Sequence, residues 1–286
     1  MTSLGEISEL VARHSLLVTM NPVYFVHISD THFGPTADYA RQGYRSLPYA
    51  RKVVEVINQL PVRPDFVIHT GDVVTHPDDD AYRLAAEVFA ALEVPIYYVT
   101  GNHDRSADIH RFLPMAPKED CQPGTDTLSY TFEIRGNRFL VLDARGPDEI
   151  DPHGLLPDQQ LDVLRREAVP DGLPLSVFIH YPALPINSPW MDANMLLLNG
   201  AEMHQALLPA RPRLRGVFHG HIHNSMQNFC DGILYCAVGS TFAGFTTWPN
   251  EAMIRADHDA MPAFNFVQCL PEHTIVMQRT FARLAG

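Results

Sequence analysis

Short apolar runs alternate with amphipathic stretches through the first part of the chain. Apolar, β-branched runs at 23–29 (VYFVHIS), 64–74 (PDFVIHTGDVV) and 94–104 (VPIYYVTGNHD) each predict a buried strand. Residues 46–60 and 78–92 lie between these runs and carry apolar residues at helical spacing, which predicts two helices. A strand–helix–strand–helix–strand order is typical of parallel crossover units.

The second part of the chain indicates more antiparallel structure. Residues 127–145 predict a hairpin around an Arg-Gly-Asn turn, 155–169 predict a helix and 174–182 predict a strand. A helix near 201–209 leads to the apolar run 214–224, and the remaining tail is rich in short strands. We therefore predict an α/β fold in which two sheets pack face to face with helices outside.

Composition and length fit one ordinary globular domain. The chain has 286 residues, of which 46% are hydrophobic and 19% charged, and it has no repeat or evident linker. We expect a single domain over 1–286, with an N-terminal extension (1–20) and a C-terminal β-rich segment (241–286). The extension is amphipathic and lacks a basic start or a cleavage site, so nothing in it indicates export.

Charge and cysteine usage narrow the function classes. A net charge of −12 argues against binding of a nucleic-acid polymer. No stretch approaches the roughly 18 apolar residues that a membrane helix needs. The four cysteines have no metal-binding or redox spacing, which indicates reduced thiols in a cytoplasmic protein.

Polar side chains follow the strands directly. The set consists of Asp30, His32, Asp72, Asn102, His103, His180, His221 and His223. Ligands of α/β sheets bind beyond the carboxyl ends of the strands. Any one of these residues alone could be a turn cap or a packed side chain. Buried Asp and His residues are costly unless they are paired or metal-bound, so their joint occurrence predicts a metal site.

The donor types in this set indicate two metal ions. Without His103, it contains two carboxylates, one amide and four imidazoles, too many for a single tetrahedral zinc, and it offers no thiolate. Two divalent ions that share a bridging carboxylate fit it better.

The segment 218–224 (FHGHIHN) concentrates three of the histidines. On an extended strand His219, His221 and His223 would all point to one face. Gly220 indicates either a turn or a close approach of another group to the backbone. His219 lies outside the repeated pattern of strand ends, and we interpret it as a packed neighbour.

These motifs resemble a known family. D-x-H (30–32), G-D (71–72), G-N-H-D (101–104), the strand-end His180 and G-H-x-H (220–223) resemble the five motifs of the calcineurin-like metallophosphoesterases. The resemblance extends over about residues 23–240. The size of the chain and its HYPALP–SPWMD segment are most similar to class III cyclic-nucleotide phosphodiesterases and bacterial glycerophosphodiesterases. Many relatives have His-His-Pro or His-x-Pro-Pro where this chain has His-Tyr-Pro.

The resemblance implies a fold, a cofactor and a reaction. The fold would be a four-layer α/β/β/α sandwich of two mixed sheets, and the cofactor two divalent metal ions, Fe, Mn, Zn or Co. Asp30, His32 and His223 would hold the first ion, Asp72 would bridge, and Asn102, His180 and His221 would hold the second. The reaction would be in-line attack of a metal-bridging hydroxide on a small soluble phosphodiester, either a cyclic nucleotide or a glycerophosphodiester.

Two neighbouring residues are candidate catalytic groups. His103 would stabilise the transition state or protonate the leaving alkoxide. Asp104 would orient His103 by accepting a hydrogen bond, or would only cap a turn.

Several alternatives stay open. A phosphomonoesterase or a nuclease of the same superfamily would carry the same ligands, because the pocket walls set the preference. A non-catalytic scaffold would be marked by the loss of ligands, and none is lost here. Homo-oligomerisation is left open. We expect His27 and His69 to be satisfied core histidines and Asp143 to lie near the site, with residues 190–194 as candidate pocket lining.

Overall fold

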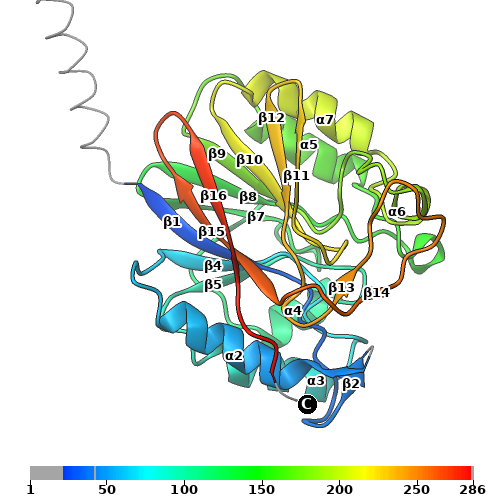
Figure 1. Cartoon of the computed structure of the whole chain (residues 1–286). Helices are drawn as coiled ribbons and strands as arrows, with labels where there is room; N and C mark the ends of the chain where they lie inside the picture. Colours follow the sequence, from blue (N-terminus) through cyan, green and yellow to red (C-terminus); the bar gives the residue numbers. More distant parts are fainter. Residues whose placement is uncertain (1–21, 42, 285–286) are drawn as a thin grey trace, which may run out of the picture.

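The computed structural model describes residues 22–41 and 43–284, so the expected N-terminal extension lies outside the described residues. Two mixed sheets form its centre (Figure 1). The first sheet has the order β16-β15-β1-β4-β5, and its strands are β1 (Val23–Ile28), β4 (Phe66–His69), β5 (Ile96–Tyr98), β15 (Ala263–Cys269) and β16 (Thr274–Thr280).

The second sheet has the order β11-β12-β10-β9-β8-β7-β6. Its strands are β6 (Glu119–Asp120), β7 (Tyr130–Ile134), β8 (Asn137–Val141), β9 (Leu175–Phe178), β10 (Leu214–His219), β11 (Met226–Cys230) and β12 (Ile233–Ala237). Two short ladders lie outside the sheets: β2 (Ala40–Arg41) with β3 (Tyr44–Arg45), and β13 (Gly244–Phe245) with β14 (Ala256–Asp257).

Helices cover the outer faces of both sheets. They are α2 (Ser46–Asn58), α3 (Asp79–Phe89), α4 (Ser106–Phe112), α5 (Asp158–Glu167), α6 (Pro189–Asn194) and α7 (Gly200–Leu207), with 3₁₀ turns η1 (Asp148–Ile150) and η2 (Leu208–Ala210). The apolar faces of α2 and α3 belong to the same buried cluster as the first sheet. Those of α5 and α7 pack with β8, β9, β10 and β12 in a second cluster. Figure 1 shows the two helix pairs on opposite sides of the molecule, which is consistent with the α/β/β/α order of layers.

The predicted crossover units are present. β1, β4 and β5 run parallel, with Val26 opposite Val67 and His69 opposite Tyr98. The predicted hairpin is also present, because β7 pairs antiparallel with β8 around the turn at Arg135 and Gly136. β15, in the C-terminal segment, pairs with β1 and so completes the first sheet.

Aromatic side chains fill the space between the sheets. The Phe25 ring of β1 lies 5.5 Å from Phe178 and 5.2 Å from Phe218, both edge-on and both from the second sheet. Phe66 of β4 contacts Phe139 of β8 at 4.9 Å. Edge-to-face rings of this kind add to the gain from burying their area. The two sheets are therefore held together directly beneath the strand ends that carry the candidate site.

Some sequence-based expectations were incomplete or wrong. Helices α4 and α6 were not expected, because each is too short to show a helical period. Strand β10 ends at His219, so His221 and His223 do not alternate along a strand as expected. All four cysteines are free, in agreement with the expectation of reduced thiols. Among the described residues, no helix is long and apolar enough to cross a membrane.

Candidate metal centre

Sharp turns carry most of the candidate ligands. Five of these residues have left-handed backbones, with φ of 57° at Asp30, 46° at His32, 56° at Asp72, 71° at His221 and 51° at His223. This conformation costs a residue with a side chain about 1–2 kcal/mol. A non-glycine residue in this region persists only where its surroundings hold it, and such residues gather at functional sites. The side chains converge because the backbone reverses direction directly after each strand.

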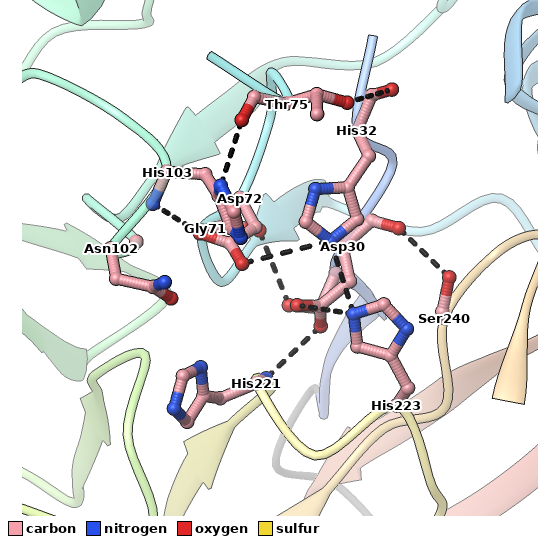
Figure 2. Close-up of polar contacts among 12 residues, drawn as sticks. Asp30, His32, Gly71, Asp72, Thr75, Asn102, His103, His221, His223 and Ser240 are labelled. Carbon is pink, nitrogen blue, oxygen red and sulfur yellow. Dashed lines mark hydrogen bonds and ion pairs between the residues drawn. The ribbon is translucent and has the colours of Figure 1, made fainter. Parts of the chain in front are cut away.

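Hydrogen bonds between neighbouring loops hold these turns. The Asp30 N–H donates to the Gly71 carbonyl and the His32 N–H to the Asp72 carbonyl, both at 3.0 Å. The Ser240 hydroxyl donates to the Asp30 carbonyl at 2.8 Å. The His221 N–H donates to Asp30 Oδ2 at 3.1 Å, which ties the two sheets together at this edge (Figure 2).

A first group of donors consists of Asp30, His32 and His223, which are all buried. His32 Nε2 lies 3.0 Å from His223 Nε2, and His223 Nε2 lies 3.4 Å from Asp30 Oδ1. The His223 Nδ1–H donates to the Ala243 carbonyl at 3.1 Å, so Nε2 of the neutral ring presents a lone pair. Figure 2 shows the three side chains pointing toward one another. Asp30 Oδ1 is buried without a hydrogen-bond partner, although it faces this group.

A second group consists of Asp72, Asn102, His180 and His221. His180 Nε2 lies 3.3 Å from Asn102 Oδ1, 3.4 Å from Asp72 Oδ1 and 3.0 Å from His221 Nδ1. The His180 Nδ1–H donates to the Thr70 carbonyl at 2.6 Å, which fixes the ring. Asp72 also links the groups, because its Oδ2 lies 3.6 Å from His32 Nε2.

The charges around these two donor groups favour the binding of cations. In the described part of the chain, Asp30 and Asp72 form ion pairs with histidines and with no lysine or arginine. Burial alone would raise the pKa of Asp72, but its electrostatic interactions with His180 and His103 outweigh burial and hold that pKa well below its ordinary value. Burial lowers the pKa of His180, yet the carboxylates of Asp72 and Asp30 raise it to about 9.

Neutral imidazoles complete the fit. Burial lowers the pKa of His32 and of His221 well below the ordinary value of histidine. Divalent cations bind ionised carboxylates, uncharged imidazoles and amide oxygens. Here several of these groups point toward one another within hydrogen-bond distance. The backbone carbonyls that hold the far nitrogens of His180 and His223 are the usual outer partners of metal-binding histidines. The residues present therefore fit two metal ions.

His103 and Asp104 do not form the pair that the sequence suggested. The His103 Nδ1–H donates to the Thr75 carbonyl at 2.7 Å, so a backbone oxygen orients this ring (Figure 2). The Asp104 carboxylate instead accepts from the backbone N–H groups of Gly101, Val73 and Val74 at 3.0–3.2 Å. The expectation that Asp104 orients His103 is wrong, because its oxygens are taken up in bracing the two loops. Burial and the charge of Asp72 raise the pKa of Asp104 to about 7.

The other histidines near the site are packed in the core, as the sequence suggested. His27 Nε2 lies 2.9 Å from the Thr70 hydroxyl and His69 Nε2 lies 2.9 Å from the Thr31 hydroxyl, so both are satisfied core residues beneath the ligand loops. His219 is buried and contacts the Gly220 carbonyl through Nδ1, outside both donor groups.

Asp143 and helix α6 support neighbouring parts of the fold. The Asp143 carboxylate accepts from the backbone N–H groups of Leu128 and Arg145, and lies outside the donor groups. Within residues 190–194, Met191 packs with Ile222, the residue between the two motif histidines. Asp192 caps the N–H of Ile186.

The structure also brings in residues that the sequence did not single out. Arg41 lies 3.3 Å from His103 Nε2, and Phe245 stacks on the His223 ring at 4.6 Å. Thr75 and Ala243 each offer a backbone carbonyl to a histidine ring, and the Thr75 hydroxyl also donates to the His32 carbonyl at 3.0 Å. Any residue type can supply a carbonyl, so the sequence offers no signal for these two positions.

Comparison with known proteins agrees with this geometry. Residues 23–225 match the family model of the calcineurin-like phosphoesterases, and the chain belongs to this family. Calcineurin-like phosphoesterases use a dinuclear metal centre. The expected family is therefore confirmed, and with it the α/β fold.

Curated relatives come from both of the expected classes. A glycerophosphodiester phosphodiesterase, GpdQ of Enterobacter lignolyticus, is 31% identical over 201 residues, 69% of this chain and 70% of the relative. A 3′,5′-cyclic adenosine monophosphate phosphodiesterase, CpdA of Pseudomonas aeruginosa, is 31% identical over 220 residues, 76% of each chain. Among solved structures, a dimetal phosphatase from Danio rerio is similar in fold, with a TM-score of 0.63 at 18% identity over 92% of this chain and 100% of that one.

Proposed function

We propose that this chain is a dinuclear metal-dependent phosphodiesterase that hydrolyses small soluble phosphodiesters, either cyclic nucleotides or glycerophosphodiesters. The observation that carries the proposal is the convergence of donors from both sheets on two adjoining positions. The names of the relatives support the diester substrate class.

We propose a role for each ligand. Asp30, His32 and His223 would hold one ion, and Asp72, whose two oxygens face His180 and His32, would bridge. The remaining proposed ligands of the second ion are Asn102, His180 and His221. We infer Fe, Mn, Zn or Co as the metals, since imidazole and carboxylate donors suit all four.

The chemistry divides between the metals and the protein. Two bound divalent ions lower the pKa of water and neutralise charge on a phosphoryl group. Hydrolysis breaks the bond from phosphorus to the leaving oxygen, forms a bond to the oxygen of water and moves a proton to the leaving alkoxide. His103, whose Nδ1–H donates to the Thr75 carbonyl, would in its protonated form donate from Nε2 to the phosphoryl oxygen or protonate the leaving alkoxide. Asp104 contributes by fixing the loops that carry Asp72 and Asn102.

The test is a substrate panel on the Mn²⁺-loaded full chain. We expect turnover of bis-p-nitrophenyl phosphate, and then of cyclic AMP or glycerophosphocholine in preference to p-nitrophenyl phosphate and single-stranded DNA. Preference for the monoester or the DNA would favour the phosphatase or nuclease alternative instead.

Variants test the ligand assignment. Asp72→Ala and Asn102→Ala should each lower kcat/KM by at least about 100-fold, because even outer-shell partners of metal ligands are worth 10- to 100-fold. Metal analysis should show loss of bound ion in both variants. Asp162→Ala is the matched control, since Asp162 is exposed on α5 and, among the described residues, pairs only with Arg165. Full activity in Asn102→Ala would refute the assignment.

We also propose a cytoplasmic location. The support is that all four cysteines are free, as expected for a reducing compartment. Fusion to a compartment-specific reporter would test it.

A further inference from the structure

Arg41 approaches the candidate site from a segment that carries no family motif. It ends β2 in the short β2–β3 ladder, and its Nη2–H donates to His103 Nε2 at 3.3 Å. The His103 Nδ1–H donates to the Thr75 carbonyl, so Nε2 is the accepting nitrogen. A nitrogen of the same ring lies within 4.8 Å of donor atoms of His32 and Asp72. The guanidinium is therefore at the edge of the proposed metal centre.

Among the described residues, no carboxylate neutralises the positive charge of Arg41, whereas carboxylates neutralise the charges of other arginines nearby. Arg105 and Arg145 also lie by the site, and both pair with Asp148, at 3.2 and 2.5 Å. Within residues 22–41 and 43–284, Arg41 forms no ion pair with a carboxylate, and its hydrogen bond goes to the neutral nitrogen of His103. A half-buried guanidinium has five N–H donors and favours a planar, anionic acceptor.

We propose that Arg41 is a substrate-binding residue whose guanidinium, next to His103, binds phosphoryl oxygen of the ester. The inference rests on the proposed function, which supplies the phosphoryl group as the anion. The planar fork of arginine matches two phosphoryl oxygens, whereas lysine would offer only a point charge. Arg41 thus supplies fixed positive charge from the chain itself, in addition to that of the metals.

The experiment compares Arg41→Ala and Arg41→Lys with the wild type, all loaded with Mn²⁺. Two quantities are measured: kcat/KM on bis-p-nitrophenyl phosphate, and the dissociation constant of inorganic phosphate by calorimetry. We expect both to worsen on the order of 10- to 100-fold in Arg41→Ala, the usual worth of a charge-assisted hydrogen bond, and less in Arg41→Lys. Bound metal should stay at the wild-type level. Arg51→Ala, which removes an exposed arginine of α2 that pairs with Glu87 of α3, should change neither quantity.

A double-variant cycle separates substrate contact from an effect through His103. If Arg41 binds the phosphoryl group itself, Arg41→Ala still weakens phosphate binding in the His103→Ala background. If it only orients His103, that loss disappears in this background, and the proposal is overturned. Unchanged phosphate affinity in Arg41→Ala would also overturn it. Absence of diesterase activity in the wild type would refute the proposed function, while the phosphate measurement would still decide the role of Arg41.

Discussion

Gly220 leaves no room for a side chain at the centre of the G-H-x-H motif. A Cβ added there would lie 1.9 Å from the Ser29 hydroxyl oxygen and 2.6 Å from Asp30 Oδ2, well inside the 3.0 Å that real Cβ contacts respect. Its φ is not in the left-handed region, so alanine is allowed by the backbone and only space is tested. The backbone cannot move away freely, because the Gly220 N–H donates to the His180 carbonyl at 3.1 Å.

The cost of Gly220→Ala follows from what must move. The Ser29 hydroxyl is free to rotate, since its contact with the Gly71 carbonyl is long at 3.4 Å. Asp30 cannot rotate without losing the hydrogen bond from the His221 N–H. Overpacking costs about 1–3 kcal/mol, and loss of a hydrogen bond to a charged group about 1.5–3 kcal/mol. Because 1 kcal/mol shifts Tm by about 2–4 °C in a chain of this size, we expect Tm to fall by about 5–24 °C.

Differential scanning fluorimetry and metal analysis measure this prediction, and metal binding should fall along with Tm. Ser29→Gly combined with Gly220→Ala removes the Ser29 hydroxyl and also the Ser29 Cβ, which the added Cβ would meet at 2.7 Å, and should recover part of the loss. Gly124→Ala is the control, since its added Cβ meets nothing within 4 Å and tests only backbone strain at a φ of +83°. A Gly220→Ala variant with wild-type Tm and full metal content would refute the close approach of the two sheets at this point.

Three further predictions follow from the same geometry. Chelation with EDTA should abolish activity and lower Tm, and Mn²⁺ should restore both. The stabilisation lost on chelation depends on the ratio of metal concentration to Kd, and is about 2.7 kcal/mol per site at 100 times Kd. An unchanged melting curve would contradict the fit of the site to metal ions. His223→Ala should lose metal and activity, while His219→Ala, equally buried four residues earlier at the end of β10, should keep its metal and lose only stability; equal metal loss in both would contradict the division of the FHGHIHN histidines. Asp104→Asn should lower the free energy of unfolding by about 1–3 kcal/mol in urea titration, because an amide cannot accept all three backbone N–H groups; unaltered stability would contradict the bracing role.

The candidate ligands could be found from sequence because each stands at a predictable place. Asp30, Asp72 and His180 follow apolar runs that can only be buried strands, and the carboxyl ends of parallel strands meet at one edge. The glycine at 220 was also informative, since a missing side chain within such a pattern indicates close approach, as the structure shows.

The remaining features of the site depend on contacts that have no residue-type signature. The orientation of His103 is set by the carbonyl of Thr75, and that of His223 by the carbonyl of Ala243. Arg41 reaches the site through a two-residue ladder too short to be predicted from periodicity. The misassigned role of Asp104 has the same origin, because its position beside His103 in the chain does not reveal that backbone N–H groups surround its carboxylate.

The arrangement of the ligands makes the site a joint between the two sheets. Asp30 and His32 follow β1 of the first sheet, whereas His223 follows β10 of the second, so the first donor group already draws on both. The second group does the same, with Asp72 after β4 and His180 after β9. An ion bound at either position would therefore link the sheets above their shared aromatic core, where Phe25 meets Phe178. The left-handed turns, each costing about 1–2 kcal/mol, fit this view, because reversal at the strand ends brings donors from two separate sheets within bonding distance of a common ion.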